Sequence, residues 1–408
     1  MKAVAALALL ISTPAFAATP EQTATAALAR ALVIDGHNDT PEQLRTLFKS
    51  DFSKFDLNKL PPEAIAKTHT SIPLLRAGRV GGQFWSVWVD PALEKNEAVV
   101  QVLEQIDTVE RMAALYPDTF RMARSSVEMA AAMKQGRIAS LIGMEGGHSI
   151  GGSLGVLRQM YRAGARYMTI THFLTTNWAD SATDAPKHDG LTPFGVEVIG
   201  EMNRLGMLVD ISHVSEAAMN DVLDVAKAPV IFSHSATRVL VDHPRNVSDA
   251  VLKRLAANGG VIMVTFVPDY VSPAVQQWEA NRAGEEARTK ALHIGTPDAA
   301  KATLSAWITA NPRPRATLAQ VADHIDHVRA VAGIDHIGLG GDYGGIETVP
   351  DGLENVGTYP ALFTELARRG YSQADLEKIA QHNIMRAMRA AEAVSGATTA
   401  LASPTQSR

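Results

Sequence analysis

Acids and histidines stand at the ends of several apolar, strand-like runs in this sequence. The first run, 33–39 (VIDGHND), ends with His37 and Asp39. Side chains two residues apart lie on the same face of a strand, so these two point the same way. An imidazole and a carboxylate directed at one point are ligands that zinc and similar divalent ions use. Because solvated loops also contain His-x-Asp, the prediction of a metal site depends on the recurrence of this design.

The same design recurs along the chain. Further apolar runs end in an acid or a histidine, namely Glu145, His172, His213, His234 and Asp342. Any one of these residues alone is more often a hydrogen-bonded structural group. Six of the eight predicted strands end in this way, however, which chance rarely produces. We therefore predict that these residues form a metal centre together.

Strand-like and helix-like segments alternate through the chain. We predict eight strands, at 33–39, 83–89, 138–145, 166–172, 207–213, 228–234, 261–266 and 336–342. Helical segments are predicted between and after them, among others at 95–116, 155–164, 193–205, 216–227, 317–332, 359–369 and 373–392. A long, charged, mostly helical insertion at 271–316 precedes the eighth strand. This alternation is typical of a (β/α)8 TIM barrel, in which all strand C-termini open on one face and catalytic groups gather there.

The number of candidate ligands indicates two ions rather than one. A single ion takes three or four protein ligands, whereas two ions share a bridging carboxylate and a bridging water. We expect Glu145 to be the bridge, His37 and Asp39 to complete one ion, and His213 and His234 the other. Two divalent charges lower the pKa of a bridging water and produce a hydroxide nucleophile without serine or cysteine. The predicted chemistry is therefore hydrolysis.

The composition limits the alternatives. The chain has 408 residues, of which 46% are hydrophobic and 20% charged, with a formal net charge of -5. This charge gives no reason to expect nucleic acid or an anionic membrane as a partner. The sequence contains no cysteine, which excludes disulfides and thiolate ligands. Any metal must be held by histidine and carboxylate groups.

Both ends of the chain differ from its middle. Residues 1–17 have a lysine, an apolar run and a final Ala-Phe-Ala, which predict a secretory signal peptide and export to a periplasm. We predict one catalytic barrel domain at 18–392 and a disordered tail at 393–408. No other segment has the about 20 apolar residues of a membrane span, and no signal for a lipid anchor is evident.

Several long motifs resemble one known family. They are DGHNDTP (35–41), GGQFWSVW (81–88), SLIGMEGGHSI (140–150), TITHFLTTNWAD (169–180), NRLGMLVDISHVS (203–215), APVIFSHS (228–235), RNVSD (245–249) and GLGGDYGG (338–345). From about residue 32 to 390 the chain resembles the membrane dipeptidase (renal dipeptidase) family of metallopeptidases. The resemblance implies an amidohydrolase-like barrel with two zinc ions, commonly a homodimer. It also implies hydrolysis of dipeptides with broad side-chain tolerance, including some with a C-terminal D-residue.

The resemblance also implies roles for individual residues. The positions matching the family's zinc ligands are His37, Asp39, Glu145, His213 and His234, with Glu145 bridging. His172 matches the residue that stabilises the tetrahedral oxyanion, and Asp342 the acid that transfers a proton to the leaving amine. Arg245 matches the residue that binds the free carboxylate of the substrate, a task suited to a guanidinium. Tyr270 is expected to line the pocket.

The sequence departs from the family in a few places. Asp342-Tyr343-Gly344-Gly345 stands where the family has Asp-x-Asp-Gly, so the second acid is missing. Thr40 replaces a commonly apolar residue, and the insertion 271–316 is longer than in the animal enzymes. The cysteines and lipid-anchor signal of those enzymes are absent. These departures affect substrate preference, anchoring and covalent dimer linkage, and leave the metal ligands unchanged.

Two other readings stay open. The same dizinc site could act on another amide or ester, such as a lactone, a phosphotriester, an N-acyl amino acid or a peptide natural-product precursor. Relatives of that kind often bridge their metals with a modified lysine at a strand end, and this sequence has no lysine so placed. The chain could also be a catalytically silent zinc-binding protein. The presence of His172 and Asp342, which turnover needs and metal binding does not, argues against that reading.

Overall fold

Eight parallel strands form a closed barrel in the computed structural model, which describes residues 18–93 and 95–402. They are β1 (Val33–Asn38), β2 (Val80–Trp88), β4 (Ile138–Glu145), β5 (Ala165–Thr169), β6 (Leu208–Asp210), β7 (Ile231–Ser235), β8 (Val261–Val264) and β9 (Ile337–Leu339). The barrel is closed because β1 pairs with both β2 and β9, and β2 pairs with β4. The predicted (β/α)8 fold is confirmed, and each strand overlaps a predicted one.

One further strand lies outside the barrel. β3 (Phe120–Met122) pairs with the first three residues of β4, whereas β5 pairs with the last four. The sequence did not predict β3. It is short, and only Phe120 of its three residues is buried, so it lacks an apolar run.

Neighbouring residues of each strand face different layers of the core. Ile34, Phe84, Leu141 and Tyr167 belong to the smaller apolar cluster, which also contains residues of the C-terminal helix. Residues next to them in the strands, such as Val33, Trp85, Ile142 and Met168, belong to the larger cluster that packs against the surrounding helices. This alternation with a period of two is what a barrel with a filled interior requires.

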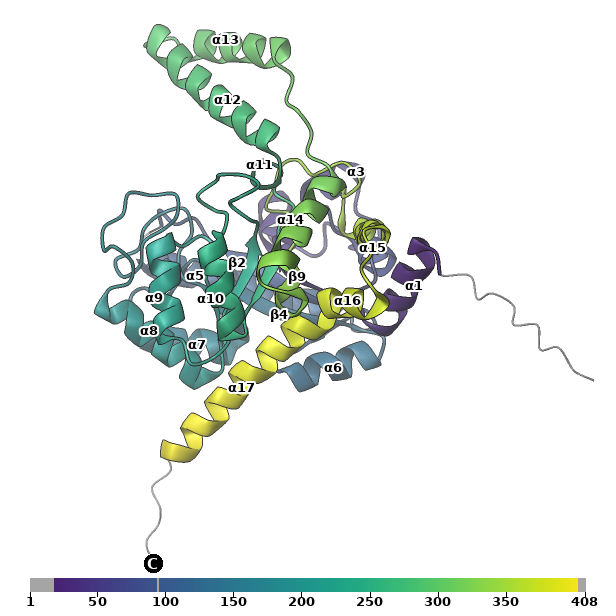
Figure 1. The fold of residues 1–408 in the computed structure, drawn as a ribbon. Helices are drawn as coiled ribbons and strands as arrows, with labels where there is room; N and C mark the ends of the chain where they lie inside the picture. The colour runs from purple at the N-terminus through teal and green to yellow at the C-terminus, as the bar shows by residue number, and fades with distance from the viewer. Residues whose placement is uncertain (1–17, 94, 403–408) are drawn as a thin grey trace, which may run out of the picture.

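Helices surround the barrel and follow its strands (Figure 1). They are α1 (Pro20–Arg30), α2 (Thr40–Phe48), α3 (Pro62–Thr68), α4 (Ile72–Ala77), α5 (Lys95–Leu115), α6 (Ser126–Lys134), α7 (Leu154–Ala163), α8 (Pro193–Leu205), α9 (Glu216–Val225), α10 (Asp249–Asn258), α14 (Leu318–Val331), α15 (Tyr359–Arg368), α16 (Gln373–Glu377) and α17 (Asn383–Ala402). Several begin at a hydroxyl residue whose side chain accepts a hydrogen bond from the first turn, as Ser215 does from Ala218 N at the start of α9.

The predicted insertion before the last strand is helical. After the short α11 (Pro268–Val271), helices α12 (Pro273–Leu292) and α13 (Pro297–Ala310) form an arm that projects away from the barrel (Figure 1). The arm has few buried residues, namely Val275, Thr289 and Ala300. Its two helices contact each other through the rings of Trp278 and Trp307, whose centroids are 5.9 Å apart. Thus the arm is stabilised mainly by its own contacts.

The structure describes the predicted C-terminal tail in part and the predicted signal peptide not at all. The predicted signal peptide, 1–17, lies outside the described residues, as do residues 403–408. The predicted disordered tail begins at residue 393, but α17 continues to Ala402. The alanines in this segment explain the difference, because alanine has the highest helix propensity. No helix of the described segments is both long enough and apolar enough to cross a membrane.

Candidate metal centre and substrate pocket

The predicted site residues meet in one cavity at the C-terminal ends of the strands. The cavity has a volume of about 320 Å³. Its lining includes Asp39, Glu145, His172, His213, His234, Arg245, Tyr270 and Asp342. His37 is fully buried and in contact distance of Asp39 and Glu145. All the candidate residues therefore lie together, although they come from segments far apart in the sequence.

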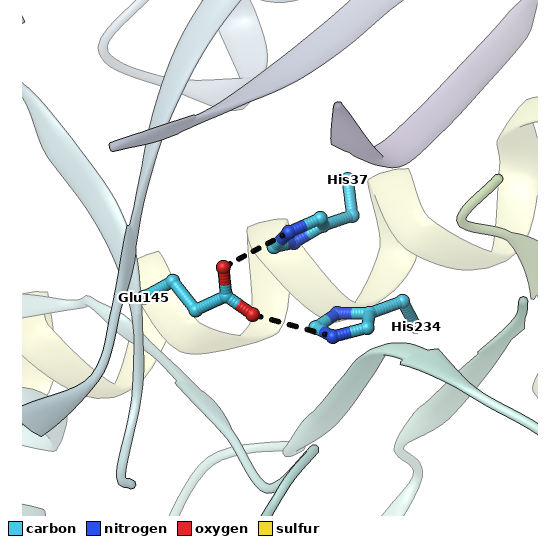
Figure 2. A group of neighbouring side chains, drawn as sticks. All are labelled: His37, Glu145 and His234. Carbon is cyan, nitrogen blue, oxygen red and sulfur yellow. Dashed lines mark ion pairs between the residues drawn. The ribbon is translucent and has the colours of Figure 1, made fainter. Parts of the chain in front are cut away.

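Glu145, at the end of β4, is at the centre of the cluster. Its Oε2 atom is 3.3 Å from His37 Nε2, while its Oε1 atom is 3.1 Å from His213 Nε2 and 3.4 Å from His234 Nε2. Figure 2 shows the two oxygens directed at different imidazoles, those of His37 and His234. A carboxylate that bridges two ions must present its oxygens in this way.

The remaining acids lie on the His37 side of Glu145. His37 Nε2 is 3.3 Å from Asp39 Oδ2 and 4.0 Å from Asp342 Oδ1. Within the described part of the chain, three overlapping groups have ligand atoms all within 4.8 Å of one another: His37, Glu145 and His234; Glu145, His172 and His213; and His37, Asp39 and Asp342. These overlapping groups of histidines and carboxylates can bind metal.

The hydrogen bonds behind His37 fit a metal ligand. Its Nδ1 atom is 2.9 Å from the Tyr167 hydroxyl, which is itself 3.1 Å from the Gly36 carbonyl and donates to it. The hydroxyl hydrogen is thus used, so Tyr167 accepts the proton of Nδ1. In the neutral ring this leaves a lone pair on Nε2, a buried atom that has no hydrogen-bond partner among the described residues. Gly143 makes the arrangement possible, because a Cβ there would lie 2.4 Å from the Tyr167 hydroxyl.

His234 has an equivalent arrangement. Its Nδ1 atom is 2.8 Å from Ser233 Oγ, and Ser233 donates its hydroxyl hydrogen to Asp210 Oδ2 at 2.6 Å. The proton of His234 is therefore on Nδ1 and the lone pair on Nε2, which faces Glu145. Burial lowers the pKa of His213 and of His234 well below the usual value, which keeps both imidazoles neutral. The Nε2 atoms of His213 and His234 lie 2.9 Å apart. Two neutral imidazoles whose ring nitrogens converge in this way suit a zinc site.

Two site residues have unusual backbone conformations. His213 has a φ of 68° and Asp342 a φ of 60°, both in the left-handed region that non-glycine residues rarely adopt. Such a conformation costs of order 1 kcal/mol or more, and it persists where the surrounding structure imposes it, often at functional sites. Each of them lies three residues beyond the end of a strand, β6 for His213 and β9 for Asp342, and both line the cavity.

Arg245 provides a buried positive charge on the cavity wall. Its side chain is fully buried and donates to Ser235 Oγ at 3.3 Å and to the His234 carbonyl at 3.1 Å. Its Nε atom has no hydrogen-bond partner, and none of the described carboxylates forms an ion pair with it. Tyr270 lies beside it, with the ring centroid 5.4 Å from the guanidinium carbon. A buried guanidinium with free donors is a receptor for an anion.

The contribution of β2 to the site is not evident from the sequence pattern. Ser86 Oγ donates to Glu145 Oε2 at 3.2 Å, and Trp88 Nε1 donates to His172 Nδ1 at 3.2 Å. Trp88 is the register partner of Glu145 in the neighbouring strand. The spacing of two residues, which places Ser86 and Trp88 on one face, was the available signal. The strand ends in no acid or histidine, so its end does not mark it as part of the site.

A closed parallel barrel with imidazoles and carboxylates gathered at one mouth defines the class of metal-dependent hydrolases. The model of the family described as Membrane dipeptidase (Peptidase family M19) matches residues 21–401. The chain therefore belongs to the membrane dipeptidase family, and it is a metallo-dipeptidase. The predicted family resemblance is confirmed.

Individual relatives agree with this assignment. An uncharacterized dipeptidase of Schizosaccharomyces pombe is 40% identical over 388 residues, which cover 92% of this chain and 84% of that protein. The probable dipeptidase PvdM of Pseudomonas aeruginosa is 25% identical with a TM-score of 0.80, over 92% of this chain and 99% of that one. A metallo peptidase of Rhodobacter sphaeroides, solved with a phosphinate mimic of the dipeptide L-Ala-D-Ala, is similar in fold, with a TM-score of 0.72. It is 20% identical, and the match covers 88% of this chain and 99% of that one.

Proposed function

We propose that this protein hydrolyses the peptide bond of dipeptides at two zinc ions held by His37, Asp39, Glu145, His213 and His234. The observation that carries the proposal is the position of Glu145, whose two oxygens face different histidines at 3.1 to 3.4 Å. The hydrogen bonds of His37 and His234, which in the neutral rings place the proton on Nδ1 and leave Nε2 unprotonated, support the same ligand set. When bound, the two ions would supply a hydroxide nucleophile at neutral pH and polarise the peptide carbonyl.

Two residues beside the ligands would assist the reaction. His172, with Nε2 3.8 Å from Glu145 Oε1, would stabilise the negative charge that develops on the carbonyl oxygen. Asp342 would transfer a proton to the leaving amine. Burial raises the pKa of Asp342 well above its usual value; His37 opposes this shift, and Asp39 and Glu145 add to it. A carboxyl with a raised pKa is suited to carrying a proton at neutral pH.

The substrate would be short because its carboxylate is bound close to the metal centre. Arg245 donates to the carbonyl of His234, a proposed ligand, so a carboxylate bound by its free N–H groups would lie close to the residues that hold the metals. Tyr270 would complete this subsite. The rest of the wall includes the apolar side chains of Phe173, Val267 and Ile346, which bind by shape and area rather than by hydrogen bonds. We propose on this basis a broad side-chain tolerance that extends to a C-terminal D-residue.

Other parts of the functional prediction rest on the sequence alone. Export to a periplasm depends on residues 1–17, and the homodimer depends on the family resemblance. Both stay predictions.

The test is a substrate panel combined with metal analysis. Purified protein is assayed with L-Ala-L-Ala, L-Ala-D-Ala, an N-acyl amino acid, a lactone and a phosphotriester, and its zinc content is measured by mass spectrometry. We expect two zinc ions per chain and turnover of the dipeptides, which a chelator abolishes and added zinc restores. Zinc-loaded protein that cleaves another substrate class but no dipeptide would contradict the proposal and favour the alternative substrate. Loaded protein without any turnover would favour the silent binding protein.

A further inference from the structure

The histidines around Glu145 differ in the partner of their Nδ1 atoms. For His37 and His234 that partner is a hydroxyl oxygen, which accepts the Nδ1 proton. For His172 it is the indole Nε1 of Trp88, at 3.2 Å. Because an indole N–H can only donate, Nδ1 of His172 must accept and cannot itself carry a proton. In the neutral ring the proton is then on Nε2, opposite to its position in His37 and His234.

The position of this proton matters because His172 stands among the ligands. Its Nε2 atom is 3.8 Å from Glu145 Oε1, and Glu145, His172 and His213 form one of the groups close enough to hold an ion. An imidazole nitrogen that carries a proton has no lone pair for a metal, but it can donate a hydrogen bond to an oxyanion. The distance alone does not separate these two roles, whereas the hydrogen bond from Trp88 does.

We propose that Trp88 is a positioning residue that holds His172 in the tautomer with Nε2 protonated. His172 is thereby excluded from the ligand set and presents an N–H group to the oxyanion of the hydrolytic step. The inference deepens the proposed dipeptidase mechanism and rests on it. The role is specific to Trp88, since no other hydrogen bond to the His172 ring is found in the described residues.

Both partners of this hydrogen bond are held in place. The rings of Trp88 and His172 also pack edge to face, with centroids 5.5 Å apart and planes at 65°. The side chain of Gln105 donates to the Trp88 carbonyl. On the other side, Ser181 Oγ donates to the His172 carbonyl at 2.6 Å, and the Phe173 ring packs 4.0 Å from the imidazole. The imidazole therefore has little freedom to turn away from Trp88.

The first measurement compares Trp88→Phe with a matched control, Trp85→Phe. Both tryptophans are in β2, but Trp85 is fully buried in the core, is absent from the cavity lining, and has an Nε1 without a hydrogen-bond partner. With zinc-loaded enzyme and a dipeptide substrate, Trp88→Phe should lower kcat by about 10- to 100-fold, as loss of an orienting partner commonly does. KM should stay within about twofold, because the lost interaction acts on the transition state. Trp85→Phe should retain the wild-type constants.

The second measurement does not use activity. Imidazole ¹⁵N resonances of zinc-loaded, [¹⁵N]histidine-labelled protein report which ring nitrogen is protonated, and the His172 signals are identified by their loss in His172→Gln. We expect wild-type His172 to be protonated on Nε2 only, and Trp88→Phe to lose this single tautomer. A proton on Nδ1 in the wild type, or a wild-type kcat in Trp88→Phe, would overturn the inference. Failure of the wild type to cleave any dipeptide would instead refute the proposed function, and the tautomer would still be decided by the resonances.

Discussion

The pocket has two walls that use similar residues in opposite ways. The ligand wall, made of His37, Glu145, His213 and His234, would present lone pairs to the metal ions in the proposed site. The donor wall, made of His172 and Arg245 with Tyr270 beside them, would present hydrogen-bond donors to the substrate. A histidine belongs to one wall or the other according to the atom behind its ring: Ser233 accepts from His234, whereas Trp88 donates to His172. The residue type therefore does not define the role, and the second layer of contacts does.

The largest effect should come from the centre of the ligand wall. Glu145→Gln removes the negative charge that would hold two cations, so we expect loss of bound zinc. The value of kcat/KM should fall by at least about 1,000-fold, or about 4 kcal/mol of transition-state stabilisation. Zinc analysis and dipeptide kinetics measure both effects. Glu42→Gln is the control, because Glu42 also lines the cavity but pairs with Arg45. Full zinc content in Glu145→Gln would contradict the bridging role.

The next largest effect should come from the donor wall, in a variant that keeps every proposed metal ligand. Arg245→Ala removes the buried guanidinium, so KM for free dipeptides should rise by about 10- to 100-fold, the value of a charged hydrogen bond or two. Zinc content should not change. A dipeptide amide lacks the carboxylate, and its kcat/KM should be nearly the same in the mutant and the wild type. An equal loss for the acid and the amide would show a structural defect and not a lost carboxylate contact.

A smaller effect is expected behind the ligand wall. Ser233→Ala removes the acceptor of the His234 Nδ1 proton, which should weaken zinc binding by about 10-fold in a competition with a chromogenic chelator. Ser140→Ala is a suitable control, since Ser140 is equally buried in the barrel and its hydroxyl has no hydrogen-bond partner. Equal affinities in the two variants would mean that the orientation of His234 does not depend on Ser233.

The smallest effect on activity is expected from the helical arm, and it tests whether the arm contributes to the substrate pocket. Trp278→Ala removes the ring contact between α12 and α13 and the hydrogen bond from Trp278 Nε1 to the Asn311 carbonyl. Hydrogen exchange in residues 273–310 should become faster, because the arm has little other support. The value of kcat/KM should stay within about twofold, since no residue of α12 or α13 lines the cavity. A larger change would place the arm in the substrate pocket.

The sequence predicts the ligand wall better than the contacts behind it. Strand ends are recognisable from apolar runs, and a parallel barrel brings them to one face, so the meeting of His37, Glu145 and His234 could be foreseen. Tyr167 contacts His37 from 130 residues away, and in the sequence it is simply an aromatic residue of a buried strand. In the sequence, Trp88 is likewise simply an aromatic residue of a predicted strand. Such contacts depend on strand register and side-chain direction, which a single sequence does not reveal.

Arg245 has no carboxylate counterion among the residues that the structure describes, and this has a consequence for the proposed turnover. A buried guanidinium without a carboxylate partner binds any small carboxylate that enters, and both products of dipeptide cleavage are amino acids with such a group. If Arg245 binds the substrate carboxylate as proposed, the product from the C-terminal position would keep its carboxylate on Arg245 after the bond is broken. Release of that product would then return the enzyme to its starting state, and acetate buffers would compete for the same position.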